Sequence, residues 1–502
     1  MRKLKKTLFT IFVLLLAAVF VTAIPASALA TNYSYIYGFW GEEIPTPDAY
    51  YVSAYLTGND FELDGEPIGN FRDPQGLYVR DNRIYVCDTR NDRIVLIEYD
   101  EKTDDYHLVR VEYSVMINGA PSEFKAPEDL FEDRNGDVYI ADTGNQRILH
   151  LDHDFNVINI IVKPDESSLE IDLEFLPQKL VVDFSGRVFT QVKNVNKGLM
   201  EFDEKGEFTS FMGAGRVHLS IADIFWRMIS SDEQLKRQEL IVPTEFNNVA
   251  IDHEGFLYTT LSTFQPHEVE YVHPVRRLNS VGTDILVRNG YWVPVGDWFY
   301  SFDNNLPYNG VSKFVDVVVF PNDSYACLDR TKGRVFLYDF QGNQLAIFGN
   351  PGNQQGFFQN PSAIDRMGND ILVLDAQSAA VTHFKQTDYG FYISEAMNFY
   401  FNGLYNESAE MWDEVLKLNG SYDLAYIGKG RAALRNEQYY EAMQYYEAKY
   451  DDENYGKAFA LYRKEWIEKH IQEIIIIIAG LYVALKVLKY VIKKTRKGRE
   501  EA

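Results

Sequence analysis

Short apolar runs bounded by Gly, Asn and Asp follow one another along most of the chain. The stretch VYIADTGNQRILHLD, residues 138–152, has the pattern of a strand, a tight polar turn and a second strand. A similar phrase, IYVCDTRNDRIVLIEYD, stands at residues 84–100. Because a single hairpin needs no second copy, the recurrence indicates a repeat architecture.

Six copies of the phrase can be followed. They begin at residues 71, 124, 175, 246, 314 and 358, and each predicts about four short strands. Four-strand units repeating every 45 residues or so are typical of a β-propeller, in which a closed ring buries faces that one blade leaves exposed. We therefore expect a six-bladed β-propeller over residues 50–393, with the run from Tyr50 to Gly58 as the outer strand of the last blade.

The turn residues of these phrases resemble those of NHL repeats. Two copies carry the full triplet, Asp88, Asn91 and Arg93 and then Asp142, Asn145 and Arg147. Asp can bind the amides of the turn, Asn tolerates a left-handed conformation, and Arg can bridge to a neighbouring strand. We assign these residues a structural role, although their composition resembles that of a catalytic set. The third, fourth and sixth copies lack the full triplet.

A helical pattern replaces the strands after Ile393. Residues 34 positions apart match in size, and the matched pairs are Tyr392 with Tyr426, Ala396 with Gly430, Ser408 with Ala442, and Trp412 with Tyr446. This spacing resembles tetratricopeptide (TPR) repeats, in which small residues let helices approach and aromatic residues fill the groove between them. Ala433 and Lys449 depart from the pattern. The resemblance implies a helical domain over residues 394–470 that binds a protein partner.

The N-terminus is typical of a secretory signal. A basic MRKLKK, an apolar run from Leu8 to Ile24 and an A-x-A site predict a signal peptide over residues 1–30 with cleavage before Thr31. A segment of residues 31–49 would then precede the propeller. The alternative is an uncleaved anchor, and either one predicts export.

A second apolar segment lies near the C-terminus. Residues 471–492 are long enough to cross a bilayer, and Lys486 and Lys489 lie in the last third, where their stems can reach the interface. The basic tail of residues 493–502 places this end in the cytosol by the positive-inside rule. The alternative is an amphipathic or partner-buried helix. We expect an extracellular, single-pass membrane protein, and the plain signal with scarce cysteine fits a Gram-positive bacterium.

Composition narrows the possible functions. The net charge of −24 argues against nucleic acid as a partner, because phosphate binding needs a concentrated basic surface. The two cysteines, Cys87 and Cys327, lie in predicted strands pointing to opposite sheet faces, so we expect free core residues rather than a disulfide.

Two connections between blades are enlarged and rich in aromatic residues. They span residues 214–245 and 289–313 and would stand over the face where propellers usually bind ligands. Aromatic planes beside polar groups suit a carbohydrate or a peptide, although the same residues could pack the insertions onto the propeller. The aromatic residues concerned are Trp226, Trp292, Trp298, Tyr300 and Tyr308.

The residue that opens each innermost strand should look into the central channel. The sequence copies align these residues as Gln75, Glu128, Gln178, Asn247 (or Asn248), Asp316 and Ser362. Six-bladed gluconolactonases hold a divalent cation with a Glu, an Asn and an Asp at comparable depth. By that resemblance Glu128, Asn247 and Asp316 would hold Ca²⁺ or another divalent cation, which prefers such oxygen ligands.

The leading hypothesis is a non-enzymatic binding scaffold without a cofactor. A propeller held on the membrane would bind a ligand or a protein, and the TPR-like helices would dock a partner. One elaboration of this hypothesis is a role beside a cell-surface sugar uptake complex. The alternative is a divalent-metal-dependent hydrolase resembling gluconolactonases. A dry or basic-filled channel would remove the hydrolase hypothesis. A purely structural surface protein is the third possibility.

Overall fold

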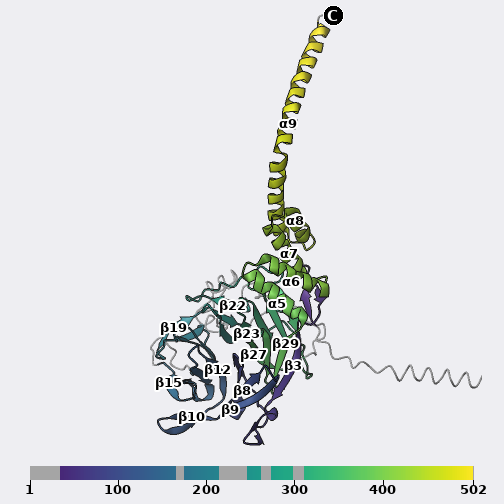
Figure 1. Cartoon of the computed structure of the whole chain (residues 1–502). Helices are drawn as coiled ribbons and strands as arrows, with labels where there is room; N and C mark the ends of the chain where they lie inside the picture. The colour runs from purple at the N-terminus through teal and green to yellow at the C-terminus, as the bar shows by residue number, and fades with distance from the viewer. Residues whose placement is uncertain (1–33, 165–173, 214–245, 262–272, 298–309, 501–502) are drawn as a thin grey trace, which may run out of the picture.

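The computed structural model describes residues 34–164, 174–213, 246–261, 273–297 and 310–500, with side chains as far as residue 493 (Figure 1). The predicted signal peptide and the enlarged connection 214–245 lie outside the described residues. Six antiparallel sheets stand around a central channel, which confirms the expected six-bladed β-propeller.

The first three blades each contain four strands in sequence order, with the first strand innermost. Blade 1 contains β6 (Gly76–Arg80), β7 (Arg83–Asp88), β8 (Arg93–Asp100) and β9 (Asp105–Glu112). Blade 2 contains β12 (Pro127–Glu132), β13 (Val138–Asp142), β14 (Arg147–Leu151) and β15 (Val157–Val162). Blade 3 contains β16 (Pro177–Val182), β17 (Val188–Val192), β18 (Leu199–Phe202) and β19 (Phe208–Met212). Two small hairpins lie outside these sheets, β4 (Glu62–Leu63) with β5 (Glu66–Pro67) and β10 (Ser114–Ile117) with β11 (Ala120–Glu123).

The last three blades depart from a uniform four strands. Blade 4 contains β20 (Asn248–Ile251), β21 (Leu257–Thr260) and β22 (Val275–Leu278). Blade 5 contains β23 (Phe314–Val319), β24 (Tyr325–Asp329), β25 (Arg334–Tyr338) and β26 (Gln344–Phe348), and is widened by β1 (Tyr35–Tyr37) and β2 (Glu43–Pro45). Blade 6 contains β27 (Pro361–Met367), β28 (Asp370–Asp375), β29 (Ala380–Gln386) and β3 (Tyr50–Thr57).

The expectation of four strands per blade is wrong for blade 4. Among the described residues no fourth strand pairs with β22. The chain after β22 folds back on its outer edge with one bridge, Leu278 to Asp284, and a hydrogen bond from the Ile285 N–H to the Arg277 carbonyl at 2.7 Å, and side chains add further bonds. Asp284 accepts the backbone N–H of Arg277 at 3.2 Å, and Arg288 donates to the carbonyl of Val275 at 2.8 Å. Asp284 and Arg288 also pair at 2.7 Å. These bonds satisfy polar groups that a fourth strand would otherwise bind.

The ring closes as predicted. Strand β3, from the N-terminal side of the propeller, pairs antiparallel with β29 from Tyr50 opposite Gln386 to Thr57 opposite Ala380. The last blade therefore combines both ends of the propeller sequence, which leaves no open edge at the junction.

The Asp-x-x-Asn-x-Arg triplets are structural. Asp88 accepts hydrogen bonds from the Asn91 amide at 2.8 Å and the Arg93 guanidinium at 2.6 Å, and also from the backbone N–H of Arg72 at 2.6 Å. Each such Asp thus ties a turn to the chain entering the same blade. The left-handed residue is not the Asn but the residue after it, Asp92, which has φ of 52° and directly precedes β8. Asp142 repeats the pattern with Asn145, Arg147 and Lys125, and Gln146 has φ of 56°.

Four short helices follow the propeller and each packs on the next, α5 (Asp388–Phe401), α6 (Tyr405–Leu418), α7 (Asp423–Arg435) and α8 (Tyr439–Glu447). The predicted small residues lie where the helices approach. A Cβ added to Gly430 would lie 2.7 Å from the Tyr446 ring, and Ser408 donates to the carbonyl of Ala396 at 2.8 Å. We call α5–α8 the helical layer.

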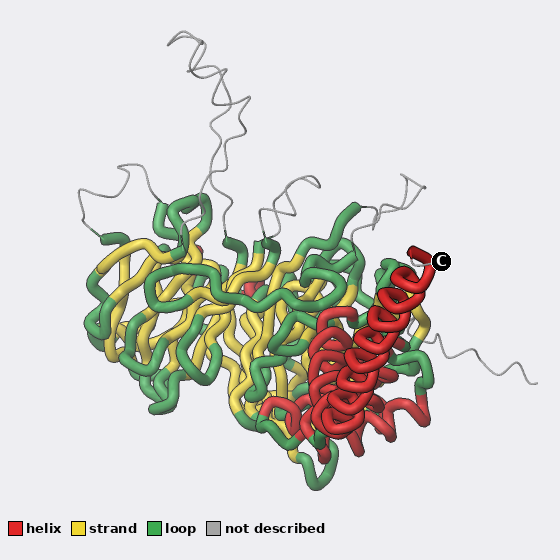
Figure 2. Tube along the Cα trace, turned by 90° about the horizontal axis from the view of Figure 1, so that it is seen from above, coloured by secondary structure: helices red, strands yellow, loops and turns green. Residues whose placement is uncertain are grey.

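The helical layer and the propeller share one apolar core. A single buried cluster contains Phe348 and Phe384 from blades 5 and 6 together with Trp412 and Tyr422 from the helices. The Tyr422 hydroxyl, fully buried, donates to the carbonyl of Leu345 in β26 at 2.8 Å. Figures 1 and 2 show the helices gathered on one side of the ring. The layer is therefore fixed to blades 5 and 6 rather than hung from a linker.

Helix α9 (Asp452–Glu500) runs on without interruption for 49 residues. Its first turns pack on α8, with Ala458 fully buried, whereas the large apolar side chains from Ile471 to Ile492 are exposed. By length and composition the segment Asp452–Lys493 contains a stretch that can cross a membrane. In Figure 1, α9 leads away from the edge of the ring. Cys87 and Cys327 are buried and free, as predicted.

Candidate functional site

The central channel contains a cavity of about 720 Å³. Residues from the innermost strand of every blade line it, from the strand middle to the turn that follows, for example Leu77–Asp81 in blade 1 and Asp316–Pro321 in blade 5. Of the residues predicted to open these strands, Asn248 and Asp316 line it, whereas Gln75, Glu128, Gln178, Asn247 and Ser362 do not. The cavity therefore opens on the face opposite the one that the sequence suggested.

A β-bulge near the start of the inner strands determines which side chains of different blades lie at the same height along the channel. The register shifts between Pro127 and Asp129, between Pro177 and Lys179, and between Phe314 and Asp316. The residue inside each bulge is Glu128, Gln178 and Val315 respectively. The predicted ring is thus wrong in blade 5, because the counterpart of Glu128 is Val315 and Asp316 lies one position further along.

The remaining members of the predicted ring bond mainly to neighbouring strands. Glu128 accepts a hydrogen bond from the Gln178 amide at 2.7 Å, and burial raises the pKa of the Glu128 carboxyl. Asn247 donates to the carbonyls of Phe314 and Val315 at 3.0 and 3.1 Å. Ser362 donates to the carbonyl of Pro74 at 3.0 Å, and Gln75 donates to Asp73 at 2.8 Å. These bonds mostly join one blade to the next.

Lys179 occupies the inner end of the cavity. Its ammonium donates to the carbonyl of Gln75 at 3.0 Å and lies 3.7 Å from the Asp129 carboxylate. Burial by itself would lower the pKa of Lys179, but the attraction of Asp129, Asp316 and other nearby groups raises it. The lysine is therefore held as a cation among carboxylates.

Asp316 lies beside this lysine. Its two oxygens accept hydrogen bonds from the Asn248 amide and from the backbone N–H of Ile364, the latter at 2.7 Å. Burial raises the pKa of Asp316 to about 7, against the opposing attraction of Lys179. The sequence copies gave a choice between Asn247 and Asn248, and it is Asn248 that reaches Asp316.

The predicted divalent-cation set does not fit this arrangement. Glu128 bonds to Gln178, Asn247 to backbone carbonyls and Asp316 to Asn248, and no recorded interaction joins the three within the described ranges. The Asn247 oxygen is buried without a hydrogen-bond partner and could by itself accept a cation, but its Nδ2 group is held by carbonyls of β23 and no recorded bond brings Glu128 or Asp316 to it. The Lys179 ammonium already neutralises charge near Asp129 and Asp316, so a metal ion at Asp316 would gain less attraction.

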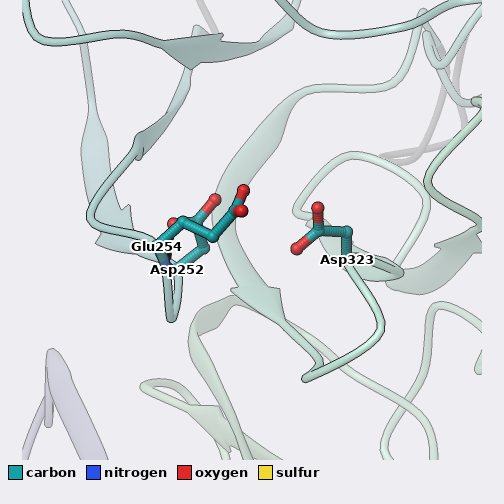
Figure 3. A group of neighbouring side chains, drawn as sticks. All are labelled: Asp252, Glu254 and Asp323. Atoms are coloured by element: carbon teal, nitrogen blue, oxygen red, sulfur yellow. Dashed lines mark hydrogen bonds between the residues drawn. The ribbon is translucent and has the colours of Figure 1, made fainter. Parts of the chain in front are cut away.

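A different set of carboxylates converges near the outer end of the cavity. Asp252, Glu254 and Asp323 bring oxygens within 4.8 Å of one another, and Figure 3 shows two facing turns that supply them. The Arg277 guanidinium fills this space, at 2.6 Å from Asp252, 2.8 Å from Glu254 and 3.1 Å from Asp323. This set is an arginine-centred ion cluster that joins blades 4 and 5.

Of the predicted aromatic residues, only Trp292 lies in the part of the chain that the structure describes. It lies away from the channel, 5.6 Å from the Tyr37 ring, and its indole N–H donates to the carbonyl of Gly38 at 3.2 Å. A small crevice that it lines also includes Tyr422 and Leu424 of the helical layer. The structure thus supports the packing alternative for Trp292. Trp226, Trp298, Tyr300 and Tyr308 are outside the described residues.

Sequence reasoning missed the charged residues inside the channel, Asp129, Lys179 and Asp365. A signal was present, because Asp129 and Lys179 stand two places after the Pro that opens their strands, and charged residues are rare at the start of an apolar inner strand. Aligning the copies on that Pro, and on Phe314 where the Pro is absent, would have brought Asp316 to the same level.

The comparisons with known proteins support the fold of this chain and nothing further. No family model and no curated protein matches the chain. Among solved structures it is similar to virginiamycin B lyase from Staphylococcus aureus (10% identity, TM-score 0.39, 67% of this chain and 100% of that chain). A streptogramin B lyase (10%, 0.38, 68% and 100%) and a Bacteroides thetaiotaomicron protein of unknown function (11%, 0.37, 68% and 79%) are also similar. Likeness at this level carries no conclusion about a ligand or a reaction.

Proposed function

We propose that this protein is a membrane-anchored binding scaffold without enzymatic activity. The observation that carries the proposal is the apolar core shared by blades 5 and 6 and the helical layer, followed by the unbroken helix α9. Two modules typical of binding are thereby held as one body at one end of a helix suited to a bilayer.

The proposed orientation is extracytoplasmic. The basic, apolar and A-x-A segments of residues 1–30 support export, and the cationic residues after Ile492 support a cytosolic C-terminus. The resemblance of the propeller to NHL repeats and of the helices to TPR repeats belongs to the same proposal, since no family model matches. The sugar-uptake elaboration loses the support of Trp292, which packs on Tyr37 and lines a crevice with Tyr422 and Leu424, whereas the other four aromatic residues lie outside the described residues.

Protease protection tests the orientation. In intact Gram-positive protoplasts, added protease should degrade the propeller of the full chain and leave a membrane-embedded C-terminal fragment. A chain ending at Lys469 should instead appear in the medium. Full protection of the propeller would contradict the orientation.

Site-specific photocrosslinking tests the scaffold role. A photoreactive residue at Tyr440 or Phe391, which are 58% and 47% exposed on the helical layer, should give a discrete crosslinked product in living cells. The matched control is Met116, 56% exposed on a remote hairpin of the propeller. Equal products at all three positions, or none, would contradict docking through the helical layer.

The alternative is a hydrolase that requires a divalent cation at Glu128, Asn247 and Asp316. Calorimetric titration of Ca²⁺ into the EDTA-treated full chain in detergent tests it. We expect the parent chain and the double variant Glu128→Gln, Asp316→Asn to behave alike toward Ca²⁺. The parent should show no stoichiometric site that the substitutions remove. Binding that disappears in this variant, with lactone hydrolysis lost in parallel, would favour the hydrolase.

A further inference from the structure

We propose that the propeller cavity binds a small organic cation, a ligand bearing one or two ammonium groups, with Asp365 as its principal contact. This inference deepens the proposed scaffold function by naming a ligand class. It concerns the cavity of about 720 Å³ on the face of the turns, away from the predicted channel mouth.

The charge around the cavity favours a cation. Its lining contains eight Asp or Glu residues and four Lys or Arg residues. Several of these acidic residues form ion pairs with basic residues, some of which line the cavity and some of which lie outside it. Glu132 pairs with Arg83, Asp183 with Arg187, and Asp252 with Arg277. Lys179 lies beside both Asp129 and Asp316, so a single ammonium group faces two carboxylates in addition to that of Asp365.

Asp365 is the carboxylate best placed to meet a ligand. It lies in β27, is partly exposed, and lines the cavity at mid-depth. Its oxygens accept the backbone N–H groups of Val79 at 2.6 Å and Arg366 at 2.8 Å, which hold the side chain in place. The adjacent Arg366 guanidinium turns to the carbonyls of Val319 and Gly368 instead. Among the described residues, Asp365 has no ion pair.

Two aromatic side chains lie in the same wall. Tyr78 and Phe131, from blades 1 and 2, have ring centroids 5.1 Å apart and both line the cavity. The Tyr78 hydroxyl is engaged by the carbonyl of Glu132 at 2.8 Å, so its ring is fixed. An ammonium group near an aromatic face gains cation–π attraction, and methylene groups gain apolar contact.

The arrangement suits an organic cation better than a metal ion. Among the described residues, the one set of carboxylates close enough to share a metal is Asp252, Glu254 and Asp323, and Arg277 fills it. Asp365 lies apart from that set. A metal needs several converging oxygens, whereas an ammonium group needs one carboxylate and a few further acceptors.

Calorimetric titration with 1,4-diaminobutane tests the proposal. The full chain in detergent, at pH 8 and 0.15 M salt, should bind one equivalent. The uncharged analogue 1,4-butanediol should not bind, and Ca²⁺ should not displace the diamine. Asp365→Asn should weaken binding at least tenfold.

Two further variants keep the test decisive. Asp81→Asn removes the same charge at an exposed position of the cavity mouth, and binding should change less than twofold. Ala250→Phe places a large side chain into the cavity from blade 4 and should abolish binding while the helical layer keeps its crosslinks. Equal affinity in Asp365→Asn, or equal binding of the butanediol, would overturn the proposal. If the helical layer gives no crosslinks while the diamine still binds, the scaffold role is overturned and the cation site is not.

Discussion

Asp365 in the sixth blade accepts the backbone N–H of Val79 in the first blade at 2.6 Å. This bond joins the two ends of the ring from inside, whereas β3 joins them from outside. Asp129 makes the same bond to Leu180 at 2.9 Å, and Asp316 to Ile364 at 2.7 Å. Channel carboxylates thus link one blade to the next, in addition to contributing charge.

The pH dependence of stability should reflect these carboxylates. Burial raises the pKa of Asp365 and of Asp316 from 3.8 to about 7. Between these values the folded state binds more protons than the unfolded state, so the free energy of unfolding falls as pH rises from about 4 to 7. Urea unfolding of Asp365→Asn from pH 4.5 to 8 should show a shallower fall than the parent chain. An unchanged slope would show that Asp365 titrates normally.

Loss of the channel lysine should destabilise the ring. Lys179→Met leaves Asp129 and Asp316 without their cation, which costs about 3–5 kcal/mol in the free energy of unfolding at pH 7.5. The cost should shrink at pH 5, below the raised pKa of Asp316 of about 7, where that carboxyl is protonated. Lys205→Met, on the exposed surface, is the control and should stay within about 0.5 kcal/mol. A pH-independent cost would point to lost packing by the lysine stem.

The turn aspartates should matter for folding and not for binding. Asp142 is fully buried and bonds to Arg147 at 2.7 Å, so Asp142→Ala should lower the free energy of unfolding by about 3–5 kcal/mol. The exposed Glu101→Ala serves as the control. Diamine affinity of the folded fraction should be unchanged. Affinity lost without a change in stability would assign Asp142 a role in the site.

The helical layer should loosen when its central tryptophan is removed. Trp412 is 2% exposed and packs on Tyr422 at a ring distance of 5.8 Å, so Trp412→Ala should cost about 3–5 kcal/mol. Limited proteolysis should then cut within α5–α8 while the propeller remains intact. Trp466→Ala on α9, where the side chain is 46% exposed, should leave the cleavage pattern unchanged. Cutting in the propeller first would contradict the expectation that the helical layer loosens before the blades.

The ring could be predicted from the sequence because hairpin phrases recur at a spacing that only a closed set of blades satisfies. The height of each channel residue along the channel could not be predicted. The bulge adds one residue to most inner strands, and Phe314 replaces the Pro that marks the bulge elsewhere, so Asp316 was placed one step too early. Trp292 was misplaced because its partner Tyr37 lies in β1, a three-residue strand too short to leave a pattern. The outer edge of β22 is met by a single bridge and by side chains, which periodicity does not reveal.

Helix α9 has a geometric consequence for access to the protein. It contains no break between Ala458, where it is packed, and Ile471, where the exposed apolar segment begins, a rise of about 20 Å. Any tilt of that segment in a bilayer is therefore passed to the propeller undiminished. In Figure 1, α9 leads away beyond the helical layer, so a bilayer around its apolar segment would be separated from the propeller by that layer and by the packed turns of α9.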